Sequence, residues 1–285
     1  MFLNYITWNV KPQIIDFGNF EIRWYSLLFA LGFIVGYYIM ASMFKRENVS
    51  IQLLDKLTIY VVISTIIGAR VGHCLFYEPD IYLKDPLKII LPFEGKLGED
   101  FRFTGFQGLA SHGGALGVLL GLFIYCYRVK KPYIWILDRM AVVTALAGMC
   151  IRLGNLMNSE IYGEQTSLPW GFKFMREQLY NPLITVVPKH PTQIYEALAY
   201  LGIFILLLWL YRKSNGNPLP GLLTSLFFIL VFTARFLIEF IKENQVDFEE
   251  KMAMNMGQWL SLPFIVAGAV ILYLALKEKL PRLSS

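Results

Sequence analysis

Residues 257–276 read GQWLSLPFIVAGAVILYLAL, a run of 20 residues without a charged side chain. A helix of this length, rising about 1.5 Å per residue, spans the roughly 30 Å hydrocarbon core of a bilayer. Lipid offers backbone amides and carbonyls no hydrogen-bond partner, so a spanning segment of this kind must be helical. The stretch therefore predicts a transmembrane helix, and it decides the class of fold.

Six more apolar stretches are long enough to span: 24–43, 57–77, 108–126, 133–151, 194–211 and 221–241. Of the 285 residues, 56% are hydrophobic and 16% are charged, whereas an average soluble domain is about 25% charged. Too few polar side chains remain to cover a soluble core, and the alternation of a β-barrel strand is missing. We expect an all-α integral membrane protein, a bundle of seven transmembrane helices in one polytopic domain over 1–285.

The positive charges set the orientation. The net charge of +5 comes from Lys and Arg in short loops, which favours a membrane surface over nucleic acid as the partner. One set of connections holds 11 Lys or Arg in 37 residues, and it consists of 44–56, 127–132, 212–220 and 277–285. The other set holds 12 Lys or Arg in 108 residues, and it consists of 1–23, 78–104, 152–193 and 242–257. The dense set is expected to be cytoplasmic. The N-terminus is then outside, the C-terminus is inside, and 152–193 forms a small outer cap.

Polar side chains within spans indicate function by default, because lipid makes them costly. In this orientation nearly all of them lie toward the outer leaflet, at the depth of phospholipid headgroups. They come from six helices and predict one cavity there: Tyr25, Arg70, His73, His112, Arg152, Asn155, Asn158, Glu160, Tyr195, Glu196, Arg235 and Glu239. An ion pathway would instead need polar residues across the whole membrane.

The arginines suggest a phosphate ligand, since a guanidinium is always charged and binds phosphate through two hydrogen bonds. Arg235 and Glu239 are four residues apart on one helix, so they are expected to pair, and Glu239 then also has a purely structural interpretation. Arg152 belongs to a polar face that follows the fourth span, together with Asn155 and Asn158.

His112 is the candidate base. It lies in the string SHGGALG at 111–117, in the second turn of its span, and a histidine can accept a proton near neutral pH. The glycines beside it permit close approach of either a ligand or another helix. His73 is interpreted as an interface residue, and Asp138 with Arg139 as an inner anchor whose long side chains reach toward water.

Metal and disulfide chemistry are not expected. The histidines at 73, 112 and 190 are far apart, and no HExxH or CxxC spacing occurs. Cys74, Cys126 and Cys150 lie within or beside apolar stretches without paired spacing, so they are interpreted as packing residues.

Four strings together resemble bacterial prolipoprotein diacylglyceryl transferases. RLGNLMNSEIYG at 152–163 is similar to the family signature R-x-G-N-x-x-N-x-E-x-x-G, and it is joined by SHGG at 111–114, HPTQIYE at 190–196 and RFLIEF at 235–240. Weaker matches are WY at 24–25, GARVG at 68–72 and GQ at 257–258. The strings occur in the family's order over nearly the whole chain. One departure is Ile151, where the family usually has Gly.

The resemblance implies an enzyme of the bacterial inner membrane with its site toward the outer leaflet. It would move the diacylglyceryl group of phosphatidylglycerol to the lipobox cysteine of a preprolipoprotein signal peptide and release glycerol phosphate. No metal or organic cofactor is required. A thiol must then lose its proton, which suits His112, and a leaving phosphate must be neutralised, which suits Arg152 and Arg235.

The remaining candidates are assigned to substrate binding or orientation, partly by family analogy: Tyr25, Arg70, Asn155, Asn158, Glu160, Gly163, Tyr195, Glu196 and Glu239. Two alternatives from other classes stay open at this stage. A transporter or channel for an anionic solute would need polar inner-leaflet residues, and only Asp138 and Arg139 offer any. A receptor-like binding protein would not need a histidine and several arginines at headgroup depth.

Overall fold

The computed structural model describes residues 5–17, 21–82, 84, 89, 93–94, 102–103, 110–180, 182–243 and 252–281. Seven helices in it are long and apolar enough to cross a membrane, which confirms the predicted all-α membrane fold. They are α1 (Trp24–Arg46), α2 (Ile51–Phe76), α5 (Ser111–Val129), α6 (Tyr133–Asn158), α8 (Thr192–Lys213), α9 (Leu222–Ile238) and α10 (Met256–Leu276). The protein is a multi-pass membrane protein.

Several helices extend beyond the stretches predicted from hydropathy. Helix α2 begins at Ile51 rather than 57, and α6 continues to Asn158 rather than ending at 151. Hydropathy marks the part of a helix in contact with lipid, whereas backbone hydrogen bonds continue into the polar region. Helix α5 differs in the other direction, because it begins at Ser111, so His112 lies in its first turn and not its second.

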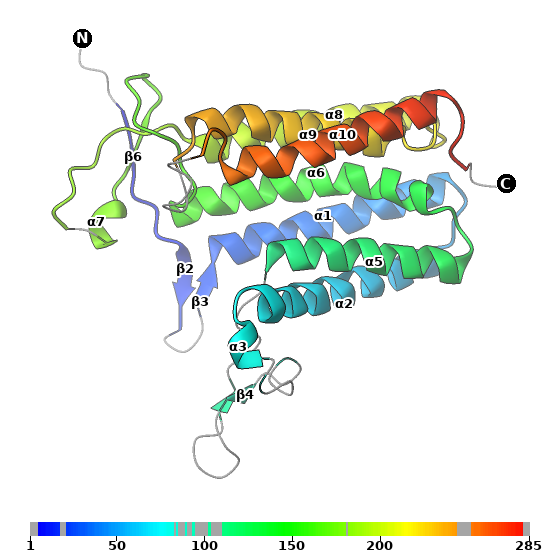
Figure 1. The fold of residues 1–285 in the computed structure, drawn as a ribbon, viewed down its shortest axis with the longest axis horizontal. Coiled ribbons are helices and arrows are strands. Elements are labelled where there is room, and N and C mark those ends of the chain that lie inside the picture. The colour runs from blue at the N-terminus through cyan, green and yellow to red at the C-terminus, as the bar shows by residue number, and fades with distance from the viewer. Residues whose placement is uncertain are drawn as a thin grey trace. The chain divides into compact units, whose positions relative to one another are not determined.

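The chain forms two compact units, described separately below. The first comprises Met1–Glu47 and Leu137–Arg282, and the second comprises Asn48–Ile136 and Leu283–Ser285. In the second unit, α2 and α5 lie side by side (Figure 1). It also contains the short helix α3 (Pro79–Tyr82) and an antiparallel pair of strands, β4 (Phe93–Glu94) and β5 (Arg102–Phe103).

Glycines bring α2 and α5 together. A Cβ added at Gly72 would lie 2.7 Å from the Cα of Gly113, and one added at Gly68 would lie 2.7 Å from the Cα of Gly117. Each helix thus presents two glycines four residues apart, the spacing that lets membrane helices approach closely. Of the two interpretations of the glycines beside His112, helix packing is confirmed.

In the first unit, α9 packs between α8 and α10 (Figure 1). Helix α1 packs on α6, where Gly32 faces Ala147 and Cys150. Short strands stand at one end of these helices: β1 (Ile6–Trp8) pairs in parallel with β6 (Phe172–Phe174), and β2 (Gln13–Asp16) forms a hairpin with β3 (Glu21–Arg23). The short helix α7 (Glu177–Tyr180) follows β6.

A small apolar core holds this end of the unit together. Leu156, Phe172 and Phe174 are buried in it, and Trp8 packs against them. The Trp8 indole Nε1 also donates a hydrogen bond to the Leu156 carbonyl at 3.0 Å. The end of α6 is therefore fixed by both strands of the β1–β6 pair, and this end carries the polar signature residues.

At the opposite end of α6, Asp138 and Arg139 are buried, so the prediction that they reach out toward water is wrong. Asp138 accepts hydrogen bonds from the Gly221 and Thr224 amides at 2.8 and 2.9 Å, which caps the start of α9. Arg139 pairs with Glu47 at 3.0 Å. Both charges are compensated by neighbouring helices, and they therefore join α6 to α9 and α1 within the membrane.

Candidate active site

The last two turns of α6 carry a polar face. Arg152, Asn155 and Asn158 follow one another at intervals of three residues, and they lie on the helix itself, not beyond it as predicted. The helix ends at Asn158, and the chain reverses at Ser159, which has a φ of 55°. Glu160 then folds back, and its Oε1 accepts hydrogen bonds from the side-chain amides of Asn155 at 2.7 Å and Asn158 at 3.1 Å.

The start of α8 fixes the backbone of this turn. The buried Gln193 side chain donates to the Glu160 carbonyl at 2.7 Å, and the Thr192 hydroxyl donates to the Ile161 carbonyl at 2.9 Å. Ile161 also has a positive φ, 60°, which a β-branched residue adopts only under strong constraint. The HPTQ string therefore holds the signature loop in shape.

Arg152 is held by α8. Its Nε lies 2.8 Å from Oε2 of Glu196, a side chain with no exposed surface, and it also hydrogen-bonds the Tyr200 side chain. Its Nη1 reaches Asn155 Oδ1 only at a long 3.4 Å. The Nε of the guanidinium is thus committed to Glu196, while the terminal nitrogens retain donor capacity.

Lys242 extends this charge chain. Its Nζ lies 3.5 Å from Glu196 Oε1 and 3.1 Å from Glu239 Oε2, and its side chain is 1% exposed. The result is an alternating series, Arg152, Glu196, Lys242 and Glu239, in which each buried charge has an opposite neighbour. Such pairing is what makes buried charges tolerable in a low-dielectric interior.

The predicted pair between Arg235 and Glu239 does not form. Helix α9 ends at Ile238, and Glu239–Ile241 continue as a 3-10 helix, η1. The tighter turn eclipses residues three apart, so Glu239 meets Lys242. Gly257 and Asn255 fix Glu239 further: its carboxylate occupies the space of a Gly257 side chain, and Asn255 Nδ2 donates to its carbonyl at 3.2 Å.

Arg235 has a hydrogen-bond donor that no described residue uses. Its Nε is buried and has no hydrogen-bond partner among the described residues. It lies close enough to Tyr200 to interact electrostatically, and Tyr200 in turn bonds Arg152. Arginines of α6 and α9 therefore both interact with one tyrosine of α8, and one of them has an unsatisfied buried donor.

Tyr25 comes to the same place from the start of α1. Its ring lies over Gly154, where an added Cβ would be 2.7 Å from Tyr25 Cδ2. It is within electrostatic reach of Glu160 and Arg152. The first unit thus gathers eight of the predicted site residues from four long helices, one turn and η1: Tyr25, Arg152, Asn155, Asn158, Glu160, Glu196, Arg235 and Glu239.

Tyr195 and Gly163 have structural partners nearby. The Tyr195 hydroxyl accepts from Trp170 Nε1 at 2.9 Å and meets His190 Nδ1 at 3.2 Å. Gly163 donates its amide to the His190 carbonyl at 2.8 Å, and an added Cβ would strike the Ile241 carbonyl. The backbone at Gly163 therefore lies close to the His190 and Ile241 backbones, and this leaves no room for a side chain at position 163.

Arg70, His73 and His112 belong to the second unit. Arg70 is buried, donates from Nε to the Ile89 carbonyl at 3.2 Å, and stacks over the Tyr82 ring. His73 stacks on Tyr77 and lies 3.6 Å from Glu78. His112 is exposed in the first turn of α5. Within the described residues no three His, Cys, Asp or Glu side chains gather as a metal site would require.

Known proteins match this chain over nearly its whole length. A sequence model of the family "Prolipoprotein diacylglyceryl transferase" matches residues 12–274. The chain belongs to this family. Curated relatives named phosphatidylglycerol–prolipoprotein diacylglyceryl transferase include proteins of Bacteroides fragilis, Tolumonas auensis and Porphyromonas gingivalis, which are 40%, 43% and 43% identical. The alignments cover 95–96% of this chain and 96–98% of those proteins.

Sequence reasoning missed three side chains that organise the site of this diacylglyceryl transferase family member. Lys242 was counted only as a loop charge, although it follows Glu239 by three residues. Tyr200 lies one helical turn after Glu196 in an apolar run, which was the available signal for it. Gln193 lies in the HPTQIYE string but was given no role, because its partner is a backbone carbonyl distant in sequence.

Proposed function

We propose that this protein transfers the diacylglyceryl group of phosphatidylglycerol to the lipobox cysteine of a preprolipoprotein. A carbon–sulfur bond forms at the glycerol carbon, the carbon–oxygen bond to phosphate breaks, and glycerol phosphate leaves with the bonding electrons. The thiol proton passes to a base on the protein. Family membership supports this reaction, and the unsatisfied buried donor of Arg235 is the observation in the site that carries it.

Arg235 is assigned the leaving phosphate. A buried guanidinium nitrogen without a partner loses its hydration without compensation, unless a ligand supplies an acceptor. A phosphate oxygen is such an acceptor, and its negative charge increases as the carbon–oxygen bond breaks. Hydrogen bonds that strengthen as charge develops lower the barrier.

Arg152 is assigned to bind the same phosphate, and its side chain is held more rigidly than that of Arg235. Glu196 holds its Nε, so the terminal nitrogens are oriented before the lipid arrives. Preorganised donors stabilise a transition state without reorganisation during the reaction. Asn155, Asn158 and Tyr25 are assigned to substrate contacts beside it, while Glu160, Glu196 and Glu239 position the donors.

His112 is assigned the thiol proton. Thiolate is the attacking form of cysteine, and an exposed imidazole can accept the proton near neutral pH. Arg70, Tyr195 and Gly163 remain in the proposal as supports of the substrate region.

The site is assigned to the outer leaflet of the bacterial inner membrane. The density of Lys and Arg favours this orientation, since it makes the connections 127–132 and 212–220 cytoplasmic. The transport alternative loses its support, because Asp138 and Arg139, the inner-leaflet residues it would need, are committed to α9 and Glu47.

The test is incubation of the purified protein with phosphatidylglycerol and a synthetic lipobox peptide. Mass spectrometry should show a diacylglyceryl adduct on the cysteine and an equal amount of glycerol phosphate. A lipobox peptide with Ser in place of Cys is the control and should remain unmodified. Absence of the adduct under conditions where the protein is folded and binds the lipid would overturn the proposal.

A further inference from the structure

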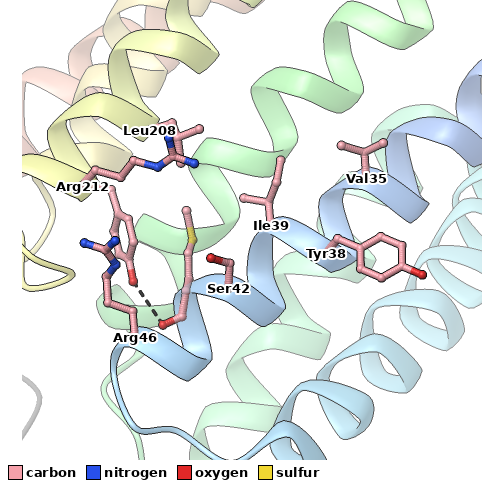
Figure 2. A pocket seen from close by; sticks show the side chains of 9 residues that line it. Val35, Tyr38, Ile39, Ser42, Arg46, Leu208 and Arg212 are labelled. Atoms are coloured by element: carbon pink, nitrogen blue, oxygen red, sulfur yellow. Dashed lines mark hydrogen bonds between the residues drawn. The ribbon is translucent and has the colours of Figure 1, made fainter.

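A groove of about 310 Å³ lies between α1 and α8 (Figure 2). It is at the ends of these helices opposite to the candidate active site. Tyr25 and Glu196 lie at the starts of the two helices, whereas the groove reaches Arg46 and Arg212 in their last turns. At 1.5 Å per residue, Tyr25 and Arg46 are about 30 Å apart along α1. The groove is therefore separate from the active site.

The groove has a charged end and an apolar end. Figure 2 shows Arg46 and Arg212 at one end, with Ser42 beside them, and Val35 at the other. Ile39 and Leu208 line the space between. From Val35 to Arg46 the helix rises about 16 Å, close to the roughly 15 Å hydrocarbon thickness of one leaflet. The groove thus runs from mid-membrane to headgroup depth.

The two guanidinium groups have no carboxylate partner among the described residues. Both are exposed, and Glu47, which follows Arg46 in the chain, is bound by Arg139 at 3.0 Å and by the Tyr211 hydroxyl at 2.5 Å. Two like charges at one end of a groove repel each other unless an anion lies between them. A phosphate group has the charge and the acceptor geometry for two arginines.

We propose that this groove binds an anionic phospholipid of the leaflet at the Arg46 end. The phosphodiester lies between Arg46 and Arg212, and one acyl chain packs along Ile39, Leu208 and Val35. In the orientation assigned above this is the cytoplasmic leaflet, which is rich in anionic lipids. The bound lipid is held at the far end of the spans from the active site, so it is not the substrate.

General attraction of the basic belt to the membrane does not explain this arrangement. Lys45 and Lys213 are adjacent in sequence to the two arginines, are exposed as well, and serve that attraction equally, but they do not line the groove. They provide a matched control, because their removal changes the charge of the same two helix ends by the same amount.

The test measures the affinity of the first bound dioleoyl phosphatidylserine on the full-length detergent-solubilised protein by native mass spectrometry. Phosphatidylserine is anionic and lacks the glycerol headgroup of phosphatidylglycerol. We expect R46Q/R212Q to lower this affinity by about tenfold or more, because it removes the direct charge-assisted hydrogen bonds to the phosphate. The K45Q/K213Q control should lower it by less than about threefold.

Two further arms separate the lipid from other anions. Leu208→Trp, which fills the apolar part of the groove and leaves both arginines, should also lower the affinity. Glycerophosphoserine and inorganic phosphate, which lack acyl chains, should not displace the lipid at concentrations well above it. Equal losses in the two double variants, no loss in R46Q/R212Q, or displacement by the soluble anions would each overturn the proposal. Melting temperatures near that of the unsubstituted protein establish that the variants are folded.

Discussion

Arg152 and Glu196 join the end of α6 to the start of α8 through an ion pair of 2.8 Å, and the Glu196 side chain has no exposed surface. Glu196 also faces Lys242, so one carboxylate compensates two buried cations. Arg152 is thereby placed by a group that need not touch the substrate. The pair ties the stability of the protein to the geometry of its candidate site.

The first prediction follows from that pair. Glu196→Gln removes the charge and leaves Arg152 and Lys242 without their shared counterion, and loss of one partner of a buried pair costs roughly 3–5 kcal/mol. We expect a lower unfolding temperature and a loss of transfer activity. Glu21→Gln, which breaks the exposed pair with Arg23, should change stability by less than about 1 kcal/mol. Equal thermal shifts for the two variants would contradict the argument.

The second prediction separates the two arginines. Arg235 makes no ion pair with a described residue, so Arg235→Lys should fold normally yet lose most turnover, because Lys lacks the planar fork. Arg152→Lys should also lose turnover, and in addition should lower the unfolding temperature, because it gives up the Nε contact with Glu196. Turnover should fall more than phosphatidylglycerol affinity in both. Normal turnover with Lys at either position would show that charge alone suffices there.

The third prediction concerns the base. His112→Gln keeps a polar side chain and removes the titratable ring, so turnover at neutral pH should fall at least about 100-fold, the low end of general-base contributions. His73→Gln is the matched control in the same unit, since His73 packs on Tyr77 and has no assigned chemistry. Turnover within a few-fold of normal in His112→Gln would remove the base role and leave His112 as a surface residue.

The fourth prediction tests the orientation on which the outer-leaflet assignment rests. Cys74, Cys126 and Cys150 are buried and free, so a cysteine-free variant should be obtainable by small substitutions. A single cysteine at Ser167 should then react with a membrane-impermeant thiol reagent in intact spheroplasts. One at Asn217, an equally exposed position in the connection between α8 and α9, should react only after lysis. The reverse pattern would invert both leaflet assignments.

Much of the fold follows from the sequence, because a bilayer allows few alternatives. Hydropathy alone located all seven spanning helices, since spanning segments must be long, apolar and helical. It misplaced the ends of α2 and α6, because a helix does not stop where lipid contact stops. The division into two compact units gave no sequence signal, since it depends on which helix faces pack together.

The site was predicted in its residue types and less well in its contacts. The intervals of three residues between Arg152, Asn155 and Asn158 predicted one shared polar face, which α6 carries, although this face was expected beyond the end of the helix. The α-helical period wrongly predicted a pair between Arg235 and Glu239. Helix α9 is followed there by a 3-10 turn, in which Glu239 pairs with Lys242. The contact between Lys242 and Glu196 joins segments far apart in the chain, and a single sequence carries no pattern for such a contact.

The last prediction uses Gly257, which makes room for Glu239. A Cβ at this position would fall on the Glu239 carboxylate, so Gly257→Ala must displace that side chain from Lys242. Lys242 would then depend on Glu196 alone, and Glu196 would be drawn toward Lys242 and away from Arg152. We therefore expect lower turnover with a smaller change in phosphatidylglycerol affinity, together with a lower unfolding temperature.

Gly202→Ala is the control for this substitution. Gly202 lies within α8, and an added Cβ there meets no atom within 4 Å. Ala is the better helix former, by about 0.5–1 kcal/mol, so Gly202→Ala should leave turnover unchanged and leave the unfolding temperature equal or higher. Adding Glu239→Gln to Gly257→Ala should cause little further loss of turnover, because the first change has already removed the carboxylate from its partner. Fully multiplicative losses in that double variant would show that Gly257 acts independently of Glu239.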